Sequence, residues 1–259
     1  MHELLQLSTY AIKQASNVIL KYYNSSYEVR MKGVGNPVTD ADIASDDILK
    51  EILLKETPEF GWLSEETRDS KSRLSKDMVW VIDPIDGTKE FVEGIPNFVI
   101  SIGLVQAANP VLGIIYNPIS KELFTGYRNN GVKLNGQNYT ISSKTEFNQM
   151  TMLNSRSETK AGLWEPYQEY FGELIPIGSI AYKLAMVATN QSDIVASLKP
   201  KNEWDICAGH CLINESGGKL VSSLGLDIKY NNSDTLVSPG LIAGNHDTVD
   251  KMLDLFKDD

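Results

Sequence analysis

Apolar residues near the start of the chain recur at the spacing of an α-helix. Within residues 2–23 they share one helical face, which predicts an amphipathic helix packed on a core. The members of this face are Leu4, Leu5, Ala11, Ile12, Ala15, Val18, Ile19 and Tyr22. Residues 38–56 predict a second helix, with Thr39 as its N-cap and Asp42 in its first turn. The polar, glycine-containing stretch 30–37 between the two helices predicts a loop.

Short apolar runs follow, and they predict strands and a final hairpin. These runs cover residues 78–82, 98–105, 111–117, 122–127 and 129–136. After about residue 146, predicted strands alternate with predicted helices. The strands are 151–156, 173–177, 192–198 and 241–245, and the helices are 178–189, 203–218 and 247–257. Consecutive strands flanked by helices are typical of α+β folds, and alternation is typical of α/β folds. We therefore expect two units, an α+β domain over residues 1–140 and an α/β domain over residues 141–259.

The charge balance narrows the choice of partners. The chain has 259 residues, with 24 basic and 34 acidic side chains and a formal net charge of -10. Such an acidic chain is a poor binder of phosphate backbones, so we expect no nucleic-acid polymer as a partner. A small anionic ligand stays compatible, because a bound metal inverts the local charge. The longest apolar run, 98–105, is far shorter than the ~20 residues of a membrane helix, so we expect no integral membrane span.

The two cysteines bear on compartment and on metal chemistry. Cys207 and Cys211 lie four residues apart on one predicted helix, which does not indicate a disulfide framework. A reducing cytoplasm is the simplest compartment, and peripheral association with an inner membrane stays open. Together with His210 the thiols suggest zinc, but without a second cluster of ligands, packing of the helix is the better interpretation.

Two aspartates end the most apolar of the predicted strands. Asp83 and Asp86 follow residues 79–82 directly, and charged side chains are seldom buried without a partner. Taken alone, Asp-Pro and Asp-Gly are also typical of turns.

Further carboxylates stand at the ends of other predicted elements. Glu65 follows an apolar pair, whereas Asp205 and Asp42 lie in the first turns of helices, where a carboxylate also interacts well with the helix dipole. Taken together, these oxygen donors indicate hard cations such as Mg²⁺, because no His or Cys accompanies them. A calcium-binding EF-hand loop starting at Asp40 is excluded, since Ala44 and Ser45 stand where an oxygen ligand and a glycine are needed.

The motifs DPIDGT (83–88), the upstream Glu65 and the downstream WD…AG…ESGG (204–218) resemble the inositol monophosphatase superfamily. The further pieces DGTKEF, SRS and NEWD are similar to its CysQ branch, the 3'(2'),5'-bisphosphate nucleotidases. The resemblance runs from about residue 37 to residue 245. It implies a layered αβαβα sandwich and a Mg²⁺-dependent, lithium-sensitive phosphatase. It also implies hydrolysis of the 3'-phosphate of adenosine 3',5'-bisphosphate (PAP) to AMP, with the phosphosulfate analogue PAPS as a further candidate substrate.

The resemblance also implies roles for individual residues, with two or three Mg²⁺ ions in the site. One metal would be held by Glu65, Asp83 and the Ile85 carbonyl, and a second by Asp83, Asp86 and Asp205. Thr88 and Asp42 would orient and deprotonate the attacking water. Backbone N–H groups of Gly87 and Thr88 would hold the phosphate at a helix N-terminus. Substrate contacts would come from the metal ligands Glu65, Ile85, Asp86 and Asp205, and from Gly178, Ser179 and Arg156, the last of which has strand capping as its alternative.

One departure from the inositol-specific pattern concerns the substrate. Inositol monophosphatases carry a glutamate for the inositol hydroxyls seven residues before the WD aspartate, and here Leu198 occupies that position. The neighbouring Lys199 and Lys201 suit a second phosphate, although solvated lysines are the equal alternative. Lys32, in the glycine-bordered loop, has the same two interpretations. An inositol or other sugar phosphatase is the alternative enzyme, and a non-catalytic nucleotide sensor is the alternative class. The oligomeric state, monomer or homodimer, stays open.

Overall fold

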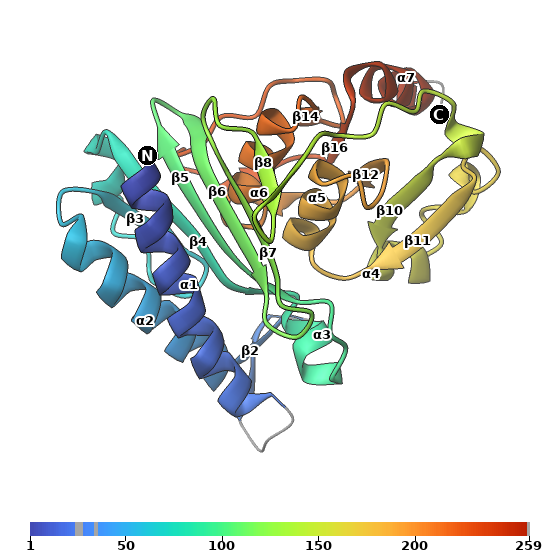
Figure 1. The fold of residues 1–259 in the computed structure, drawn as a ribbon. Helices are drawn as coiled ribbons and strands as arrows, with labels where there is room; N and C mark the ends of the chain where they lie inside the picture. Colours follow the sequence, from blue (N-terminus) through green and yellow to red (C-terminus); the bar gives the residue numbers. More distant parts are fainter. Residues whose placement is uncertain (24–27, 34–35, 258–259) are drawn as a thin grey trace.

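The chain folds into alternating layers of helices and β-sheets (Figure 1). This computed structural model describes residues 1–23, 28–33 and 36–257. The helices are α1 (His2–Tyr22), α2 (Asp40–Glu56), α3 (Thr88–Glu93), α4 (Arg156–Lys160), α5 (Ile180–Ala188), α6 (Glu203–Glu215) and α7 (His246–Lys257). Short 3₁₀ helices are η1 (Ser72–Ser75), η2 (Phe147–Gln149) and η3 (Glu165–Tyr167).

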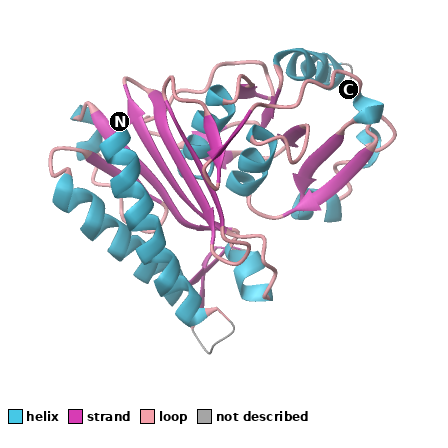
Figure 2. Ribbon diagram, in the orientation of Figure 1, coloured by secondary structure: helices cyan, strands magenta, loops and turns pink. Residues whose placement is uncertain are grey.

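One sheet has seven strands and the other has five, and Figure 2 shows both in magenta. The larger sheet runs β3 (Gly61–Ser64), β4 (Met78–Asp86), β5 (Val99–Gln106), β6 (Asn109–Asn117), β7 (Glu122–Tyr127), β8 (Val132–Leu134) and β9 (Gln137–Tyr139). The smaller has the order β11 (Glu173–Ile177), β10 (Thr151–Ser155), β12 (Ile194–Ser197), β16 (Leu241–Gly244) and β14 (Lys219–Ser222). Two-stranded pairs join β1 (Val29–Gly33) to β2 (Asn36–Thr39) and β13 (Lys201–Asn202) to β15 (Leu236–Val237).

Side-chain alternation along β4 explains why this strand can carry a site at its end. Trp80 and Ile82 pack with α1 and α2 on one face of the large sheet, while Val79 and Val81 pack with α5 and α6 on the other. Because both faces of the sheet are covered here, the sequence of this strand is a continuous run of apolar residues. The buried strand ends with Asp83 and Asp86, so its packing determines where these carboxylates lie.

Helix α6 lies against the large sheet at short range because two strand positions have no side chain. A Cβ on Gly113 of β6 would lie 2.3 Å from the Ala208 carbonyl oxygen, and one on Gly103 of β5 would lie 2.5 Å from Cys207 Sγ. Only glycine permits this approach. As a result, the N-terminus of α6, which carries Asp205, is held close to the end of β4.

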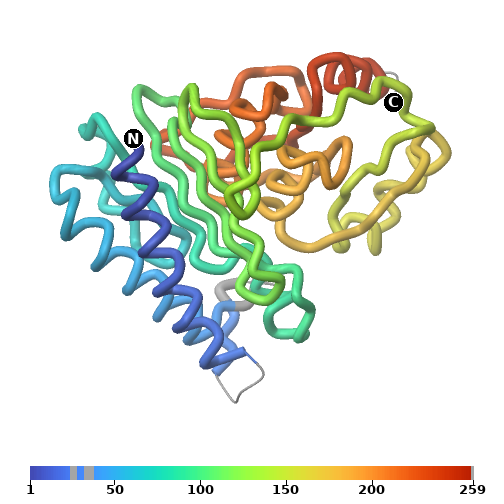
Figure 3. Tube along the Cα trace, viewed as in Figure 1, coloured from blue at the N-terminus to red at the C-terminus, as the bar shows by residue number. Residues whose placement is uncertain are grey.

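The second sheet completes the layers. Helices α5 and α6 lie between the two sheets, and α7 packs on the far side of β14 and β16 through Val249 and Met252. Figure 3 shows the chain passing from the blue N-terminal helices on one outside face to the red α7 on the other. The expected αβαβα sandwich is therefore confirmed. The division into domains 1–140 and 141–259 stays a prediction.

Most predicted elements form, but some features differ from expectation. The stretch 30–37 is not a plain loop, because its described backbone forms the antiparallel pair β1–β2. The sequence patterns did not indicate β3, β14 or the short pair β13–β15, all of which have at most four residues per strand. Such strands are too short to show a period, so their pairing is a tertiary effect. Across the described ranges, none of the helices combines the length and apolar character that crossing a bilayer requires.

Candidate active site

The site begins where β4 loses its regular register. Pairing with β5 shifts between Asp83 and Asp86, so that this segment bulges out of the ladder. Asp83 closes a local turn, because its Oδ1 accepts a hydrogen bond from the Ile85 N–H at 3.0 Å. Gly87 then adopts a φ of 101°, a left-handed conformation suited to glycine, and α3 starts at Thr88. The turn interpretation and the ligand interpretation of this motif are therefore compatible.

Three carboxylates from three separate segments of the chain lie close together near the end of β4. Single oxygen atoms of Glu65, Asp83 and Asp205 all lie within 4.8 Å of one another. Asp205 lies in the first turn of α6, where it also accepts a hydrogen bond from the Asn202 N–H at 2.8 Å. Asp205 therefore takes part in capping the N-terminus of α6 and also belongs to the cluster.

Glu65 reaches the cluster because its short loop is fixed to α2. The buried Asp46 accepts hydrogen bonds from the hydroxyls of Ser64 and Thr67, which flank Glu65 in the chain. The Glu65 N–H also donates to the Ile82 carbonyl of β4 at 3.3 Å. Burial raises the pKa of Asp46, and the two hydroxyl donors oppose that rise. Residues 64–67 are therefore held from both sides.

The electrostatics of the cluster favour a bound proton or a bound cation. Burial raises the pKa of Asp83 well above its usual range, and the nearby Glu65, Asp86 and Asp205 add to the rise. The pKa of Asp205 is raised in the same way, first by burial and then by Asp86 and Glu65. Converging carboxylates in a low-dielectric site repel one another unless a proton or a metal intervenes. Donors that are all oxygen fit Mg²⁺, so the residues present match that ion.

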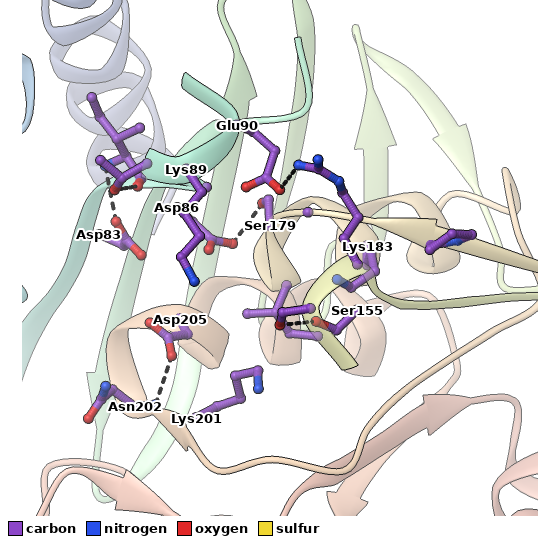
Figure 4. Close-up of a pocket in the computed structure, with 18 of the residues that line it drawn as sticks. Asp83, Asp86, Lys89, Glu90, Ser155, Ser179, Lys183, Lys201, Asn202 and Asp205 are labelled. Carbon is purple, nitrogen blue, oxygen red and sulfur yellow. Dashed lines mark hydrogen bonds and ion pairs between the residues drawn. The ribbon is translucent and has the colours of Figure 1, made fainter. Parts of the chain in front are cut away.

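Asp86 connects this cluster to the second half of the chain. Its Oδ2 accepts hydrogen bonds from the Ser179 hydroxyl at 2.7 Å and from the Ala181 N–H at 2.6 Å, at the start of α5. Burial raises the pKa of Asp86 to about 6, while these two hydrogen bonds oppose the rise. Figure 4 shows Asp86 between Ser179 and the side chain of Lys89.

A pair made of the half-buried Thr88 and the buried Asp42 lies beside the cluster. The Thr88 hydroxyl lies 3.1 Å from Asp42 Oδ1 and 3.1 Å from the Ile85 carbonyl oxygen, and both are acceptors. The other oxygen of Asp42 accepts from the Thr39 N–H at 2.7 Å and from the Thr39 hydroxyl at 2.6 Å. Burial raises the pKa of Asp42 to about 6 despite these hydrogen bonds. A carboxylate with a pKa near neutrality is suited to accept a proton.

These groups open into one large cleft with a volume of about 910 Å³. All the residues predicted to bind metal or substrate line it: Glu65, Asp83, Ile85, Asp86, Gly87, Thr88, Arg156, Gly178, Ser179 and Asp205. Asp42 does not line the cleft and reaches it through Thr88. The walls also carry cationic side chains opposite the carboxylates, and Figure 4 labels three of them: Lys89, Lys183 and Lys201.

Comparison with known proteins identifies the family of the chain that carries this site. The model of the inositol monophosphatase family matches residues 1–254. The chain belongs to the inositol monophosphatase family.

Similar proteins agree with this assignment. An inositol monophosphatase of Mesembryanthemum crystallinum is 31% identical over 237 residues, covering 88% of each chain. A Nus factor SuhB of Haemophilus influenzae is 33% identical over 263 residues, covering 98% of this chain and 95% of its own. The crystal structure of the extragenic suppressor protein suhB of Bartonella henselae has a TM-score of 0.87 at 26% identity, with 98% of both chains covered.

Membership of this family establishes the general type of reaction, which is phosphate hydrolysis. Members of the inositol monophosphatase family are phosphatases that depend on Mg²⁺, and a small phosphorylated substrate is consistent with the site. The carboxylate cluster is where such an ion fits in this member of the family.

Arg156 makes different contacts from those expected. Its guanidinium pairs with Glu90 at 2.5 Å and with Glu93 at 2.8 Å, both on α3. These pairs raise the pKa of Arg156 and join α3 to α4 at the cleft wall. A phosphate must therefore compete with two carboxylates for this side chain, which makes Arg156 a weaker candidate for substrate binding than its position suggested.

Lys183 is a residue that the sequence motifs did not single out. It is buried on α5, its Nζ donates to the Ile177 carbonyl at 2.7 Å, and it lines the cleft. Burial lowers its pKa to about 8, while the nearby Asp86 opposes the fall. The sequence feature that could have identified Lys183 is a lysine within the otherwise apolar helix 180–188, four residues after Ser179.

The other residues considered in the sequence analysis lie in different places relative to the cleft. Lys201 lines the cleft, whereas Lys199 is exposed and is not among the lining residues. Cys207, Cys211 and His210 are buried in the packing of α6. The side chain of Lys32 lies outside the described residues.

Proposed function

We propose that the chain is a Mg²⁺-dependent 3'(2'),5'-bisphosphate nucleotidase that converts PAP to AMP and phosphate, with PAPS as a second substrate. The observation that carries the proposal is the pair Lys183 and Lys201 in the wall of the cleft that contains the carboxylate cluster. A substrate with two phosphates places one at the cluster and needs cationic partners for the other.

The two lysines are suited to that task. The ammonium groups have backbone carbonyl acceptors, Ile177 for Lys183 and Lys199 and Pro200 for Lys201, which a phosphate can replace. Lys201 also lies 4.0 Å from Glu158 Oε1, which is longer than a direct hydrogen bond. At neutral pH a lysine with a pKa of about 8 is still mostly protonated, so Lys183 contributes a positive charge.

Leu198 supports the same conclusion. In inositol monophosphatases the corresponding glutamate contacts inositol hydroxyls, but here Leu198 packs against an apolar cluster that includes Trp164 and Ile242. Its N–H donates to the buried Glu158 at 3.2 Å, which fixes the turn before Lys201. An inositol ring would find no acceptor at this position.

Mechanistically, the chain supplies positioning and proton acceptance. Thr88 Oγ1 can accept a hydrogen bond from the attacking water while its own hydrogen points to Asp42 Oδ1. The water proton then moves to Thr88, and the Thr88 proton moves to Asp42, whose pKa of about 6 suits this exchange. We expect the backbone N–H groups of Gly87 and Thr88, at the start of α3, to hold the phosphoryl group.

Glu65, Asp83, the Ile85 carbonyl, Asp86 and Asp205 would hold the metal ions. When bound, Mg²⁺ activates the water and stabilises the leaving oxygen in this class of reaction. Ser179 and Ala181 orient the Asp86 carboxylate for this role through their hydrogen bonds.

Inositol monophosphate hydrolysis is the second candidate function. The observation in its favour is the relative from Mesembryanthemum crystallinum, which is named an inositol monophosphatase and is 31% identical. A non-catalytic nucleotide sensor is less favoured, because the Thr88–Asp42 pair and the carboxylate cluster are intact.

A substrate panel tests the proposal. Phosphate release with Mg²⁺ is measured for PAP, PAPS, inositol 1-phosphate and fructose 1,6-bisphosphate, and the nucleotide product is identified by chromatography. We expect PAP to have the highest kcat/KM, with AMP as its product. A higher kcat/KM for inositol 1-phosphate would overturn the nucleotidase proposal while leaving the phosphatase assignment intact.

A further inference from the structure

A buried arginine lies at the contact between the two halves of the chain. The Arg73 side chain is 1% exposed, yet it carries a full charge and five N–H donors. It donates to both carboxylate oxygens of Asp69 at 3.2 and 2.8 Å, to Asn231 Oδ1 at 2.7 Å and to the Asn232 carbonyl at 2.8 Å. These four hydrogen bonds, two of them to a carboxylate, make burial of the charge tolerable.

A buried glutamate holds the same two asparagines from the opposite side. Glu203 is 0% exposed. Its carboxylate accepts hydrogen bonds from the Asn231 N–H at 2.7 Å and from the Asn232 N–H and side-chain amide at 2.9 Å each. Asn231 and Asn232 therefore lie between Arg73 of the first half and Glu203 of the second. We call these four residues the asparagine bridge.

The asparagine bridge is attached to both metal-site segments that do not belong to β4. Arg73 packs against the start of β3, where a Cβ on Gly61 would lie 2.9 Å from the Arg73 Cβ, and β3 leads directly to Glu65. Glu203 is the first residue of α6, one residue before Trp204 and two before Asp205. The Glu203 N–H also donates to the Thr235 carbonyl at 2.9 Å, which ties the same loop to the start of α6.

We propose that the asparagine bridge positions Glu65 and Asp205 for metal binding. The two ligands come from separate elements, and their like charges favour separation when no cation is present. The bridge opposes this separation by fixing the Glu65 segment and the α6 N-terminus to one loop. None of its residues lines the cleft, so it acts through the ligands and not on the substrate. The proposal rests on the metal site and is independent of the nucleotide assignment.

The key variant is Asn231→Gly. It removes the amide that joins Arg73 to the loop, and it suits a residue whose φ is 64°. We expect the dissociation constant for Mg²⁺, measured by calorimetry on metal-free protein, to rise by roughly tenfold. With saturating Mg²⁺, kcat should return to within about twofold of the wild type, because the reacting groups are unchanged. Arg73→Met should weaken binding further if it folds.

A matched control separates positioning from general stability. Asp193→Asn weakens another buried carboxylate, one that is bound to Ser142, Lys144 and Thr151 and does not line the cleft. This variant should lower the melting temperature and leave the Mg²⁺ dissociation constant unchanged. An Asn231→Gly protein that is less stable but binds Mg²⁺ with wild-type affinity would overturn the proposal, since a purely structural bridge predicts that result. Calorimetry needs no substrate, so this outcome is distinguishable from failure of the nucleotidase proposal.

Discussion

The Ser179 hydroxyl donates a hydrogen bond to Asp86 Oδ2 at 2.7 Å, and this contact joins the end of β4 to the start of α5. The Ala181 N–H donates to the same oxygen at 2.6 Å. Asp86 therefore serves two purposes at once. It connects the two halves of the chain, and it contributes a charge beside Asp83 and Asp205 that a metal-free protein must tolerate.

These two purposes can be separated with Asp86→Asn. The amide oxygen can still accept from Ser179 and Ala181, so the fold should be kept. Because the folded-state pKa of Asp86 is raised to about 6, ionisation at pH 7.5 costs about 3 kcal/mol of stability. Asparagine cannot ionise, so the melting temperature in EDTA should rise by several degrees. Turnover with Mg²⁺ should fall by orders of magnitude, because an anionic ligand is lost.

Asp86→Ala is the control for this experiment. It removes the charge and both hydrogen bonds, so its melting temperature in EDTA should be lower than that of Asp86→Asn. An Asp86→Asn protein with wild-type turnover would mean that Asp86 is a turn residue without a role in the reaction.

Metal dependence is a second prediction. The cluster of Glu65, Asp83 and Asp205 consists of oxygen donors, and burial, together with repulsion from nearby carboxylates, raises the pKa of both aspartates. Activity should vanish in EDTA and return with Mg²⁺, and Mg²⁺ should raise the melting temperature of the metal-free protein. Ca²⁺ should inhibit, because its longer bonds and looser geometry misplace the water. Full activity in chelator would contradict the metal site.

Local apolar patterns predicted the helices and most of the longer strands, whereas the layered arrangement and the roles of the carboxylates came from the resemblance to a known family. The apolar period of α1 and the run in β4 are visible in any short window. In contrast, the partners of Arg156 could not be predicted, since Glu90 and Glu93 lie more than sixty residues away and only the packing of α3 against α4 brings them together.

Lys183 and the asparagine bridge show the same limit. A single lysine in an apolar helix has many possible partners, and only the fold shows that it borders the cleft. Arg73 and Asn231 are 158 residues apart in the chain. Neither belongs to a motif, and their hydrogen bonds follow from tertiary contact alone.

Loss of Thr88 function is a third prediction. Thr88→Val keeps the shape but removes the hydroxyl that lies 3.1 Å from Asp42 Oδ1. We expect kcat to fall by about 10²-fold or more with little change in KM, because proton acceptance is used only in the transition state. Thr88→Ser should recover much of the rate. Equal rates for the Val and Ser variants would exclude the hydroxyl from the reaction.

The fourth prediction concerns Lys199 and Lys201, the two lysines that follow Leu198 in the chain. Lys201→Ala should raise KM for PAP by roughly tenfold at low salt, since a charge-assisted hydrogen bond is worth about 1.5–3 kcal/mol. The contact exists in ground and transition states alike, so kcat should change little. Added salt should reduce the difference, because partly exposed charges are screened.

Lys199→Ala provides the matched control for Lys201→Ala. It removes the same charge two residues away, from a side chain that is exposed and does not line the cleft. Its KM for PAP should stay near the wild-type value. Any weak activity of Lys201→Ala on inositol 1-phosphate should also be unchanged, because that substrate has no second phosphate. Equal effects of the two variants on KM would contradict a specific role for Lys201.

The fifth prediction concerns His210 and the stability of the protein in mild acid. His210 is buried on α6, with Nδ1 2.9 Å from the Tyr230 hydroxyl, and burial lowers its pKa to about 4. The nearby Lys229 lowers the pKa further, while Asp227 opposes the fall. The folded state therefore keeps His210 neutral in a pH range where the unfolded chain already binds a proton.

The sign of the effect follows from that difference. Between pH 6.5 and about pH 4 the unfolded state binds one more proton at this site, so the free energy of unfolding falls as the pH falls. The full contribution of neutral His210 to stability is present above pH 6.5, and about 3 kcal/mol of it is lost by pH 4.

His210→Asn retains an oxygen near the Nδ1 position but cannot titrate. Urea unfolding at pH 7.5, 6.5, 5.5 and 4.5 should therefore give a flatter pH dependence for this variant than for the wild type. Tyr230→Phe keeps His210, so it should be less stable at every pH yet retain most of the wild-type slope. Parallel curves for His210→Asn and the wild type would show that His210 does not control acid stability, because the carboxylates of the active site are common to both proteins and cancel in the comparison.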